Sequence, residues 1–303
     1  MRNKTLITVV GPTAIGKTVL AIKLAQHYQT EIISSDSRQF YKEMHIGTAV
    51  PTDKELKMAK HHFVQHKSIV DAYNVGDFER DAIALLHNLF EEKNVVVMAG
   101  GSGLYVDAVL NGMDDFPDID PKIRETLNLQ LHSEGIESLQ QQLELLDPET
   151  FAKIDTANPR RIIRALEVCI ATGKSYASFL KKQSQKRNFS SIIIGITAER
   201  SIIYDRINRR VDLMMAQGLL EEVRSLKAHK TLNALNTVGY KELFKYLDGE
   251  QSLEFAVSEI KKNTRRFAKR QLTWFRKKTD IIWVENVTDF GKITHIIDSL
   301  LNR

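Results

Sequence analysis

Short apolar runs recur along the chain, and amphipathic stretches with helical spacing separate most of them. Runs that suit buried strands lie at 6–10, 31–34, 95–99, 192–197 and 281–284. A continuous apolar run bounded by turn residues is typical of a strand covered on both faces. Strands that alternate with helices along a chain form a parallel sheet. We therefore predict an α/β fold, with a parallel sheet and helices on both of its faces.

Residues 113–189 depart from this alternation. The pattern over 127–146 predicts helical structure, and Asp147-Pro148 marks a break. Asn158-Pro159 has the N-cap and first-turn arrangement of a further helix, and Gly173 is expected to end that helix. We predict that residues 113–189 form a helical insertion domain.

The rest of the chain, residues 1–112 and 190–303, is predicted to form the α/β core with a C-terminal helical and basic region. From 202 to 278 the pattern is helical, with breaks near Gly218, Gly239 and residues 248–249, and 289–303 predict a closing helix. Glycine and Asp-Gly pairs commonly end helices because they favour backbone conformations that are incompatible with a helix.

Composition narrows the class of protein. The 303 residues are 43% hydrophobic and 27% charged, with a net charge of +5. No apolar run approaches the length of a membrane span, and the first one is too short for a signal peptide. The single cysteine, Cys169, excludes an internal disulfide and lies on an apolar helical face, where a buried structural thiol is expected. We expect a cytoplasmic monomer that does not associate with membranes.

Positive charge is concentrated near the C-terminus. From 261 to 278 the chain has nine Lys or Arg residues and no Asp or Glu, with aromatic residues between them. The basic residues are Lys261, Lys262, Arg265, Arg266, Lys269, Arg270, Arg276, Lys277 and Lys278. A solvated helix face is the ordinary explanation of such a run, but its length without acids favours a surface that binds a polyanion.

A phosphate-binding loop follows the first predicted strand. Its residues fit the pattern G-x-x-x-x-G-K-[ST] and are Gly11, Pro12, Thr13, Ala14, Ile15, Gly16, Lys17 and Thr18. An apolar-faced helical pattern comes directly after them, so the motif has the strand–loop–helix context that its mechanism needs, rather than that of a chance glycine turn. Backbone N–H groups would hold a di- or triphosphate, Lys17 would add a full charge, and the Thr18 hydroxyl would face Mg²⁺.

Polar residues also follow the second and third long strands. Asp36 comes after 31–34, and Ser102 lies in the glycine-rich turn after 95–99. The carboxyl ends of parallel strands meet at one edge of a sheet, so both side chains are expected near the phosphate-binding loop. Asp36 could hold Mg²⁺ through water or accept a proton, and a helix N-cap is its structural alternative. No carboxylate ends the 95–99 strand, which weakens an ATP-hydrolysing interpretation.

One helical segment offers two arginines to a phosphate group. Arg206 and Arg210 are four residues apart, so they share one helical face and could clamp a charged phosphate. Alone, this signal is weak, because helix surfaces often carry arginine.

These segments together resemble the tRNA dimethylallyltransferase family, the bacterial-type tRNA isopentenyl transferases. The resemblance runs through nearly the whole chain and is most specific in three segments, DSRQFY at 36–41, AGGSGLY at 99–105 and RRFAKRQLTWFR at 265–276. It continues in MHIGTAVPT at 44–52, YNVGDF at 73–78, NPRRIIRALEV at 158–168, RINRRVDLMMAQGLLEEV at 206–223 and NTVGYKEL at 236–243. Two positions depart from the family pattern, since Ser102 replaces a usual threonine and Val50 a frequent lysine.

The resemblance implies transfer of a dimethylallyl group from its diphosphate to N6 of adenosine 37 in tRNA. The phosphate-binding loop would then hold the diphosphate of an isoprenoid, with Mg²⁺ at Thr18. Asp36 would be the general base, and Ser102 and Arg210 would stabilise the departing diphosphate. Positions expected to contact the tRNA anticodon stem-loop are Asp36, Ser37, Arg38, Gln39, Ser102, Arg124, Arg160, Arg161, Ile162, Ile163 and Arg164, joined by Lys269 and Arg270 of the basic run.

Two other classes of protein remain as alternatives. A P-loop small-molecule kinase that uses ATP would explain the loop and Asp36, but not the basic run. A non-catalytic nucleotide switch that binds RNA would need a base-specificity element and a metal-organising carboxylate after the third strand, and the sequence has neither.

Overall fold

The computed structural model describes residues 4–114, 116–180 and 186–302. The chain divides into two compact units. The first consists of Met1–Asn111 together with Lys186–Arg303, and the second is Gly112–Gln185, inserted between the two halves of the first. The predicted insertion, 113–189, includes Asp115 and residues 181–185, which lie outside the described residues.

A six-stranded parallel sheet forms the centre of the first unit, in the order β3-β2-β4-β1-β5-β6. The strands are β1 (Thr5–Val10), β2 (Ile32–Ser34), β3 (His61–His62), β4 (Val95–Gly100), β5 (Ser190–Thr197) and β6 (Ile281–Glu285). The five strands predicted from apolar runs are confirmed. The edge strand β3 was not predicted, because two histidines carry no strand pattern.

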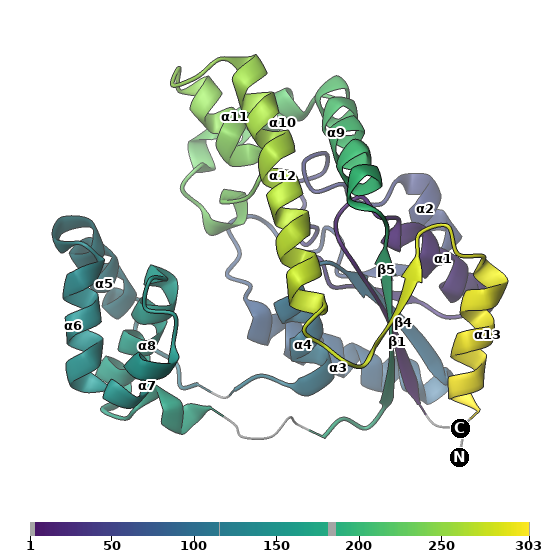
Figure 1. Cartoon of the computed structure of the whole chain (residues 1–303), viewed down its shortest axis with the longest axis horizontal. Helices are drawn as coiled ribbons and strands as arrows, with labels where there is room; N and C mark the ends of the chain where they lie inside the picture. Colours follow the sequence, from purple (N-terminus) through teal and green to yellow (C-terminus); the bar gives the residue numbers. More distant parts are fainter. Residues whose placement is uncertain (1–3, 115, 181–185, 303) are drawn as a thin grey trace. The chain divides into compact units, whose positions relative to one another are not determined.

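Helices cover both faces of the sheet, as predicted (Figure 1). On one face, Leu6 and Val10 share a core with α3 (Val75–Glu92) and α4 (Gly103–Asn111). On the other face, the alternate residues of β1, Ile7 and Val9, share a core with helices at both ends of the chain, α1 (Lys17–His27) and α13 (Phe290–Leu301). This alternation of side chains is the two-residue period of a strand that is buried on both faces.

The C-terminal half of the first unit adds a helical region. Its α-helices are α9 (Arg200–Ala216), α10 (Leu219–Ser225), α11 (Tyr240–Leu247) and α12 (Leu253–Phe275), while the short α2 (Asp53–Met58) lies earlier in the chain. The predicted breaks are confirmed: Gly218 and Gly239 precede α10 and α11 with φ of +99° and +96°, and Asp248 is the C-cap of α11.

The second unit is helical. It contains α5 (Pro121–Glu134), α6 (Ile136–Leu146), α7 (Pro148–Lys153) and α8 (Pro159–Thr172). The helical structure predicted over 127–146 is confirmed, and Gly135 at φ +85° divides it into α5 and α6, a division that was not predicted. Asn158 caps α8 and Gly173 ends it in the left-handed conformation, as predicted. The break predicted at Asp147 is confirmed, whereas the short α7 that Asp147 caps was not predicted.

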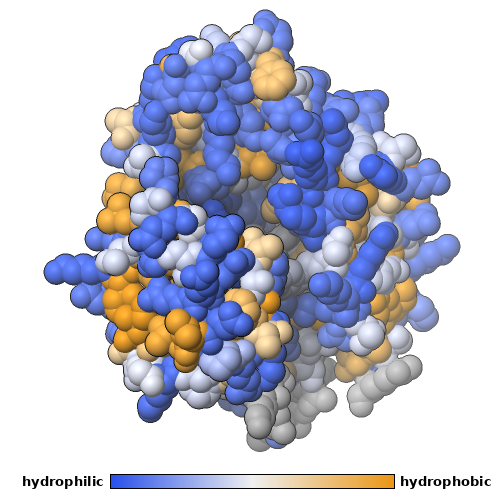
Figure 2. Space-filling model, turned by 60° about the vertical axis from the view of Figure 1, so that its left-hand side comes forward, coloured by the Kyte–Doolittle hydropathy of each residue, from blue (hydrophilic) through white to orange (hydrophobic). Residues whose placement is uncertain are grey.

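Cys169 is buried on α8, and burial raises the pKa of its thiol, which agrees with a structural role. Hydrophilic residues cover most of the molecular face in Figure 2, and apolar residues gather there in small patches. Among the described residues, no helix is long and apolar enough to cross a membrane.

Candidate active site

The phosphate-binding loop connects β1 to α1 and borders a cavity of about 600 Å³. Gly16 caps α1 at φ +109°, a conformation that glycine adopts without steric cost. Of the eight predicted loop residues, 13–18 line the cavity, whereas Gly11 and Pro12 are buried and do not line it. The Lys17 ammonium donates a hydrogen bond to the Pro12 carbonyl at 2.8 Å, which holds the positive charge against the loop.

Residues from the carboxyl ends of β2 and β4 complete this side of the cavity. Asp36 follows β2, while Ala99 and Gly100 end β4. Because β4 lies between β1 and β2 in the sheet, the small side chain of Ala99 and the bare Gly100 leave space between Asp36 and the loop. The predicted meeting of Asp36 with the phosphate-binding loop is confirmed.

Two cations, Lys17 and Arg210, line the cavity together with the Asp36 carboxylate, and Glu55 adds a second carboxylate to its lining. Burial lowers the pKa of Lys17 to about 8, the nearby Asp36 carboxylate opposes that shift, and Arg210 adds to it. Burial also lowers the pKa of Arg210, with Asp36 again opposing the shift. Desolvated cations attract an anion more strongly than exposed ones do, so this arrangement favours a phosphate group.

Asp36 heads a turn rather than a helix, so its alternative role as an N-cap is wrong. Its Oδ1 accepts a hydrogen bond from the Arg38 backbone N–H at 3.1 Å. The next residue, Ser37, donates its backbone N–H to the Ser102 hydroxyl at 3.2 Å, and the two hydroxyls are also 3.2 Å apart. Ser102 therefore supports the Asp36 turn, and it is not among the residues that line the cavity.

The two arginines of α9 have different surroundings. Arg210 lines the cavity, and its Nη1 lies 3.5 Å from the Thr13 hydroxyl. Arg206 donates to the Ile15 carbonyl at 3.0 Å and so braces the loop from outside the cavity. The arginine clamp expected from their spacing is wrong in this form, because only Arg210 reaches the place where a ligand would lie.

Gln271 is a positioning residue that sequence reasoning missed. It is buried on α12, and its Oε1 accepts from the Thr13 backbone N–H at 2.8 Å. Its Nε2 donates to the Gly101 carbonyl at 2.9 Å. One amide thus links the phosphate-binding loop to the turn after β4. Its position inside the segment RRFAKRQLTWFR was the only available signal.

Two residues expected to contact RNA donate hydrogen bonds to backbone carbonyls of the protein itself. Arg38 donates through Nη1 to the carbonyls of Asn233 and Ala234, at 3.0 and 2.9 Å. Gln39 donates to the carbonyls of Thr48 and Ala49, at 3.3 and 3.0 Å. These bonds fix the polypeptide around the cavity.

The basic run lies largely on α12, and part of its charge is compensated by acids distant in the sequence or outside the run. Lys261 pairs with Asp212 at 2.5 Å, Lys262 with Glu259 at 2.8 Å, and Lys278 with Asp107 at 2.5 Å. The expectation that no acid compensates the charge of this run is therefore wrong for the folded protein, where three of its basic residues form ion pairs. Among the described residues, no acidic partner is found for the exposed basic side chains of Arg266, Lys269, Arg270, Arg276 and Lys277.

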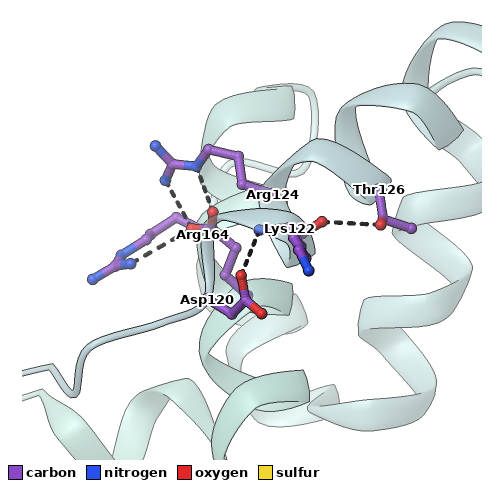
Figure 3. A network of polar contacts seen from close by, with 6 residues as sticks. Asp120, Lys122, Arg124, Thr126 and Arg164 are labelled. Carbon is purple, nitrogen blue, oxygen red and sulfur yellow. Dashed lines mark hydrogen bonds and ion pairs between the residues drawn. The ribbon is translucent and has the colours of Figure 1, made fainter.

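In the second unit, two of the expected RNA-binding arginines share one buried carboxylate. Glu167, whose side chain is 4% exposed, accepts two hydrogen bonds from Arg124 and one from Arg164 Nη1 at 3.5 Å. Figure 3 shows the two guanidinium groups converging on this point. Arg164 also lies over the Phe116 ring, 4.8 Å from its centre, and that ring stacks on Tyr176. Both arginines are thus held in place while their outer edges stay exposed.

The remaining residues of α8 that were expected to bind RNA differ in their burial. Arg160 and Arg161 are exposed in its first turn, where their side chains are accessible. Ile162 and Ile163 are 0% and 5% exposed and pack in the core of the second unit. Their side chains hold α8 in place, which leaves the arginines as the side chains that can reach a nucleic acid.

Fold and cavity together define an α/β protein with a phosphate-binding loop at the carboxyl edge of a parallel sheet. Comparison with known sequences specifies it further: the sequence model of the family described as IPP transferase matches residues 39–278. This chain belongs to the IPP transferase family.

Individual relatives are similar to this chain over nearly its full length. The chain is 60% identical to the tRNA dimethylallyltransferase of Christiangramia forsetii, over 98% of each chain. A solved tRNA isopentenylpyrophosphate transferase from Bacillus halodurans is 37% identical with a TM-score of 0.74, covering 99% of this chain and 97% of that one. A eukaryotic dimethylallyltransferase solved acting on tRNA is 25% identical with a TM-score of 0.82, covering 99% and 80%.

Proposed function

We infer that this protein transfers a dimethylallyl group from dimethylallyl diphosphate to N6 of adenosine 37 in tRNA and releases diphosphate. The observation that carries the inference is the cavity in which the phosphate-binding loop and Arg210 face Asp36, in a chain of the IPP transferase family. Its relatives of known sequence and structure carry the names of tRNA dimethylallyl or isopentenyl transferases.

The cationic groups of the cavity suit a diphosphate leaving group. In the reaction, the N6 electron pair forms a bond to C1 of the allyl group, and the C1–O bond electrons leave with the diphosphate. Negative charge therefore grows on the oxygen that departs. Lys17, the loop amides and Arg210 would stabilise that charge, and preorganised donors of this kind commonly provide the largest share of catalysis.

Asp36 is the group best placed to take the proton that N6 loses. Its carboxylate lines the cavity, and its turn is fixed by the bonds of Arg38 and Ser102. An exocyclic adenine amine is a poor nucleophile, so a positioned base is useful. Ser102 would act on this step through Ser37, as a positioning residue, rather than by touching the diphosphate.

The cavity also fits Mg²⁺ that arrives with a diphosphate. Among the described residues no group of three or more His, Cys, Asp or Glu forms a metal cage, and Mg²⁺ typically uses one or two protein oxygens together with phosphates and water. The Thr18 hydroxyl and the Asp36 carboxylate both line the cavity as oxygen donors. When bound, the metal ion would neutralise diphosphate charge.

For RNA, each unit offers its own contacts. The exposed Lys269 and Arg270 of α12 would bind phosphates, and the 41% exposed Trp274 beside them offers a ring for stacking. Arg160 and Arg161 provide similar charges on α8 of the second unit. Contacts of this kind would offset the cost, about a few kcal/mol, of extruding a stacked base.

A direct product assay tests the function. The protein is incubated with unmodified tRNA, labelled dimethylallyl diphosphate and Mg²⁺, and the RNA is digested to nucleosides. We expect label in N6-(dimethylallyl)adenosine and release of diphosphate. Absence of that nucleoside, together with transfer of the γ-phosphoryl group of ATP to a small acceptor, would instead favour the kinase alternative.

Removing the free charges of α12 should weaken RNA binding in a salt-dependent way. For a Lys269→Ala/Arg270→Ala double variant, we expect weaker tRNA binding and a slope of log Kd against log salt that is flatter by about 1.5, because two phosphate contacts are lost. Binding is measured by fluorescence anisotropy across a salt series. The matched control is Lys227→Ala/Lys230→Ala, which loses the same charge from two lysines paired with Asp248. An equal change in both double variants would contradict the assignment.

A further inference from the structure

The loop 45–50 forms a wall of the cavity. Five of its residues, His45, Ile46, Thr48, Ala49 and Val50, line the cavity. Ile46, Ala49 and Val50 are apolar, whereas the loop at 13–18 supplies the polar end. With a diphosphate at the polar end, the hydrocarbon part of the substrate would meet this wall, so the position of the wall matters for the fit of that chain.

A carboxylate from outside the cavity holds this wall in place. Glu222 on α10 accepts three backbone N–H groups of the wall: from His45 at 3.0 Å and Ile46 at 2.7 Å through Oε2, and from Gly47 at 3.0 Å through Oε1. Three successive N–H groups that converge on one anion form a nest, which is a strong and directional arrangement. Glu222 does not itself line the cavity.

A buried tyrosine fixes the carboxylate in turn. The Tyr240 hydroxyl donates to Glu222 Oε1 at 2.6 Å, and the tyrosine is 0% exposed. Burial, and then the Glu222 charge, raise the pKa of Tyr240, so the phenol remains a proton donor at neutral pH. The same ring lies against Gly47, where an added Cβ would come within 2.5 Å of a ring carbon. The wall, the carboxylate and the ring are therefore packed as one group.

The opposite side of the wall is held by its carbonyl groups. Gln39 donates to the Thr48 and Ala49 carbonyls. The N–H groups of the first half of the wall thus bind Glu222, and the carbonyls of the second half bind Gln39. Loss of the Glu222 acceptor would free the first half, including Ile46.

We propose that Glu222 is a positioning residue that sets the isoprenoid-chain selectivity of the enzyme by fixing the wall 45–50. The proposal rests on the proposed function, since it assumes an allylic diphosphate in this cavity. A fixed wall limits the room beyond a five-carbon chain, and a released wall admits a longer one while holding the short one less well.

The test compares Glu222→Gln with Glu221→Gln. The amide of Glu222→Gln places an N–H₂ group against backbone N–H donors, so we expect KM for dimethylallyl diphosphate to rise about ten-fold. The ratio of kcat/KM for dimethylallyl over geranyl diphosphate should fall, while KM for tRNA stays within about two-fold of wild type. Glu221→Gln removes the same charge from the neighbouring, exposed residue and should match wild type.

A second variant distinguishes a change in selectivity from a loss of folded protein. Tyr240→Phe keeps the ring against Gly47 and removes only the hydroxyl, so it should shift KM and selectivity in the same direction by a smaller factor. Unchanged selectivity in both variants, or an equal loss for both diphosphates that follows a lowered thermal midpoint, would overturn the proposal. A wild-type protein that makes no prenylated nucleoside would instead refute the proposed function itself.

Discussion

Replacing Asp36 with asparagine is expected to lower kcat for prenyl transfer by a factor of about 10²–10⁴, the usual contribution of a general base. Asparagine fills the same volume and its oxygen can still accept the Arg38 N–H, so the turn should persist. What disappears is the group proposed to receive the N6 proton. Single-turnover rates with preformed protein–tRNA complex measure this step, and Kd for tRNA should change by less than about three-fold because the fixed turn remains.

A second carboxylate in the same cavity provides the control. Glu55 also lines the cavity, and it accepts the Thr52 N–H at the start of α2. Glu55→Gln removes the same negative charge from the cavity but leaves the proposed base intact. If Glu55→Gln slowed the reaction as much as Asp36→Asn, the loss would reflect the electrostatics of the cavity, and the assignment of Asp36 as base would be wrong.

The second large effect is expected at Lys17. Lys17→Met should reduce kcat/KM for dimethylallyl diphosphate by about 10²–10³, because a preorganised charge on the leaving group is lost. Lys23→Met is the matched control, as it removes an exposed lysine from the same helix. Steady-state kinetics with saturating tRNA distinguish the two, and a Lys17→Met enzyme with near-normal kcat/KM would contradict a diphosphate at this loop.

The lowered pKa of Lys17 gives this prediction a pH dependence. Burial is the main cause of the shift to about 8, so below that pH the free protein carries the charged ammonium, and above it the proton is lost. A diphosphate binds the charged form. KM for dimethylallyl diphosphate should therefore be level below about pH 8 and rise above it, by up to about ten-fold per pH unit. The rise should be absent in Lys17→Met.

Local signals in the sequence predicted most of the sheet and the centre of the site. Buried strands carry their own apolar runs, and the phosphate-binding loop is a contiguous motif. Asp36 was placed correctly because strand ends share an edge. By contrast, β3 has two polar residues and no periodicity, and Gly135 divides a helix whose apolar spacing continues on both sides of it.

Partners that are distant in the sequence could not be predicted. Gln271 and Thr13 are 258 residues apart, and Glu222 and Gly47 are 175 apart. No local pattern marks which glutamine or glutamate of a helix turns inward. The same limit explains the basic run, where counting acids nearby in the sequence overlooked Asp212 and Asp107.

Helix α12 carries both a buried residue that supports the phosphate-binding loop and exposed basic residues proposed to bind RNA. Its buried Gln271 accepts the Thr13 N–H, and the exposed Arg270 and Lys269 are one and two residues away from it in the sequence. If RNA binds Lys269 and Arg270 as proposed, the helix that contacts the polynucleotide is also the helix whose glutamine holds the loop proposed to bind the diphosphate. A change at the outer side of α12 would then act on the binding of both substrates.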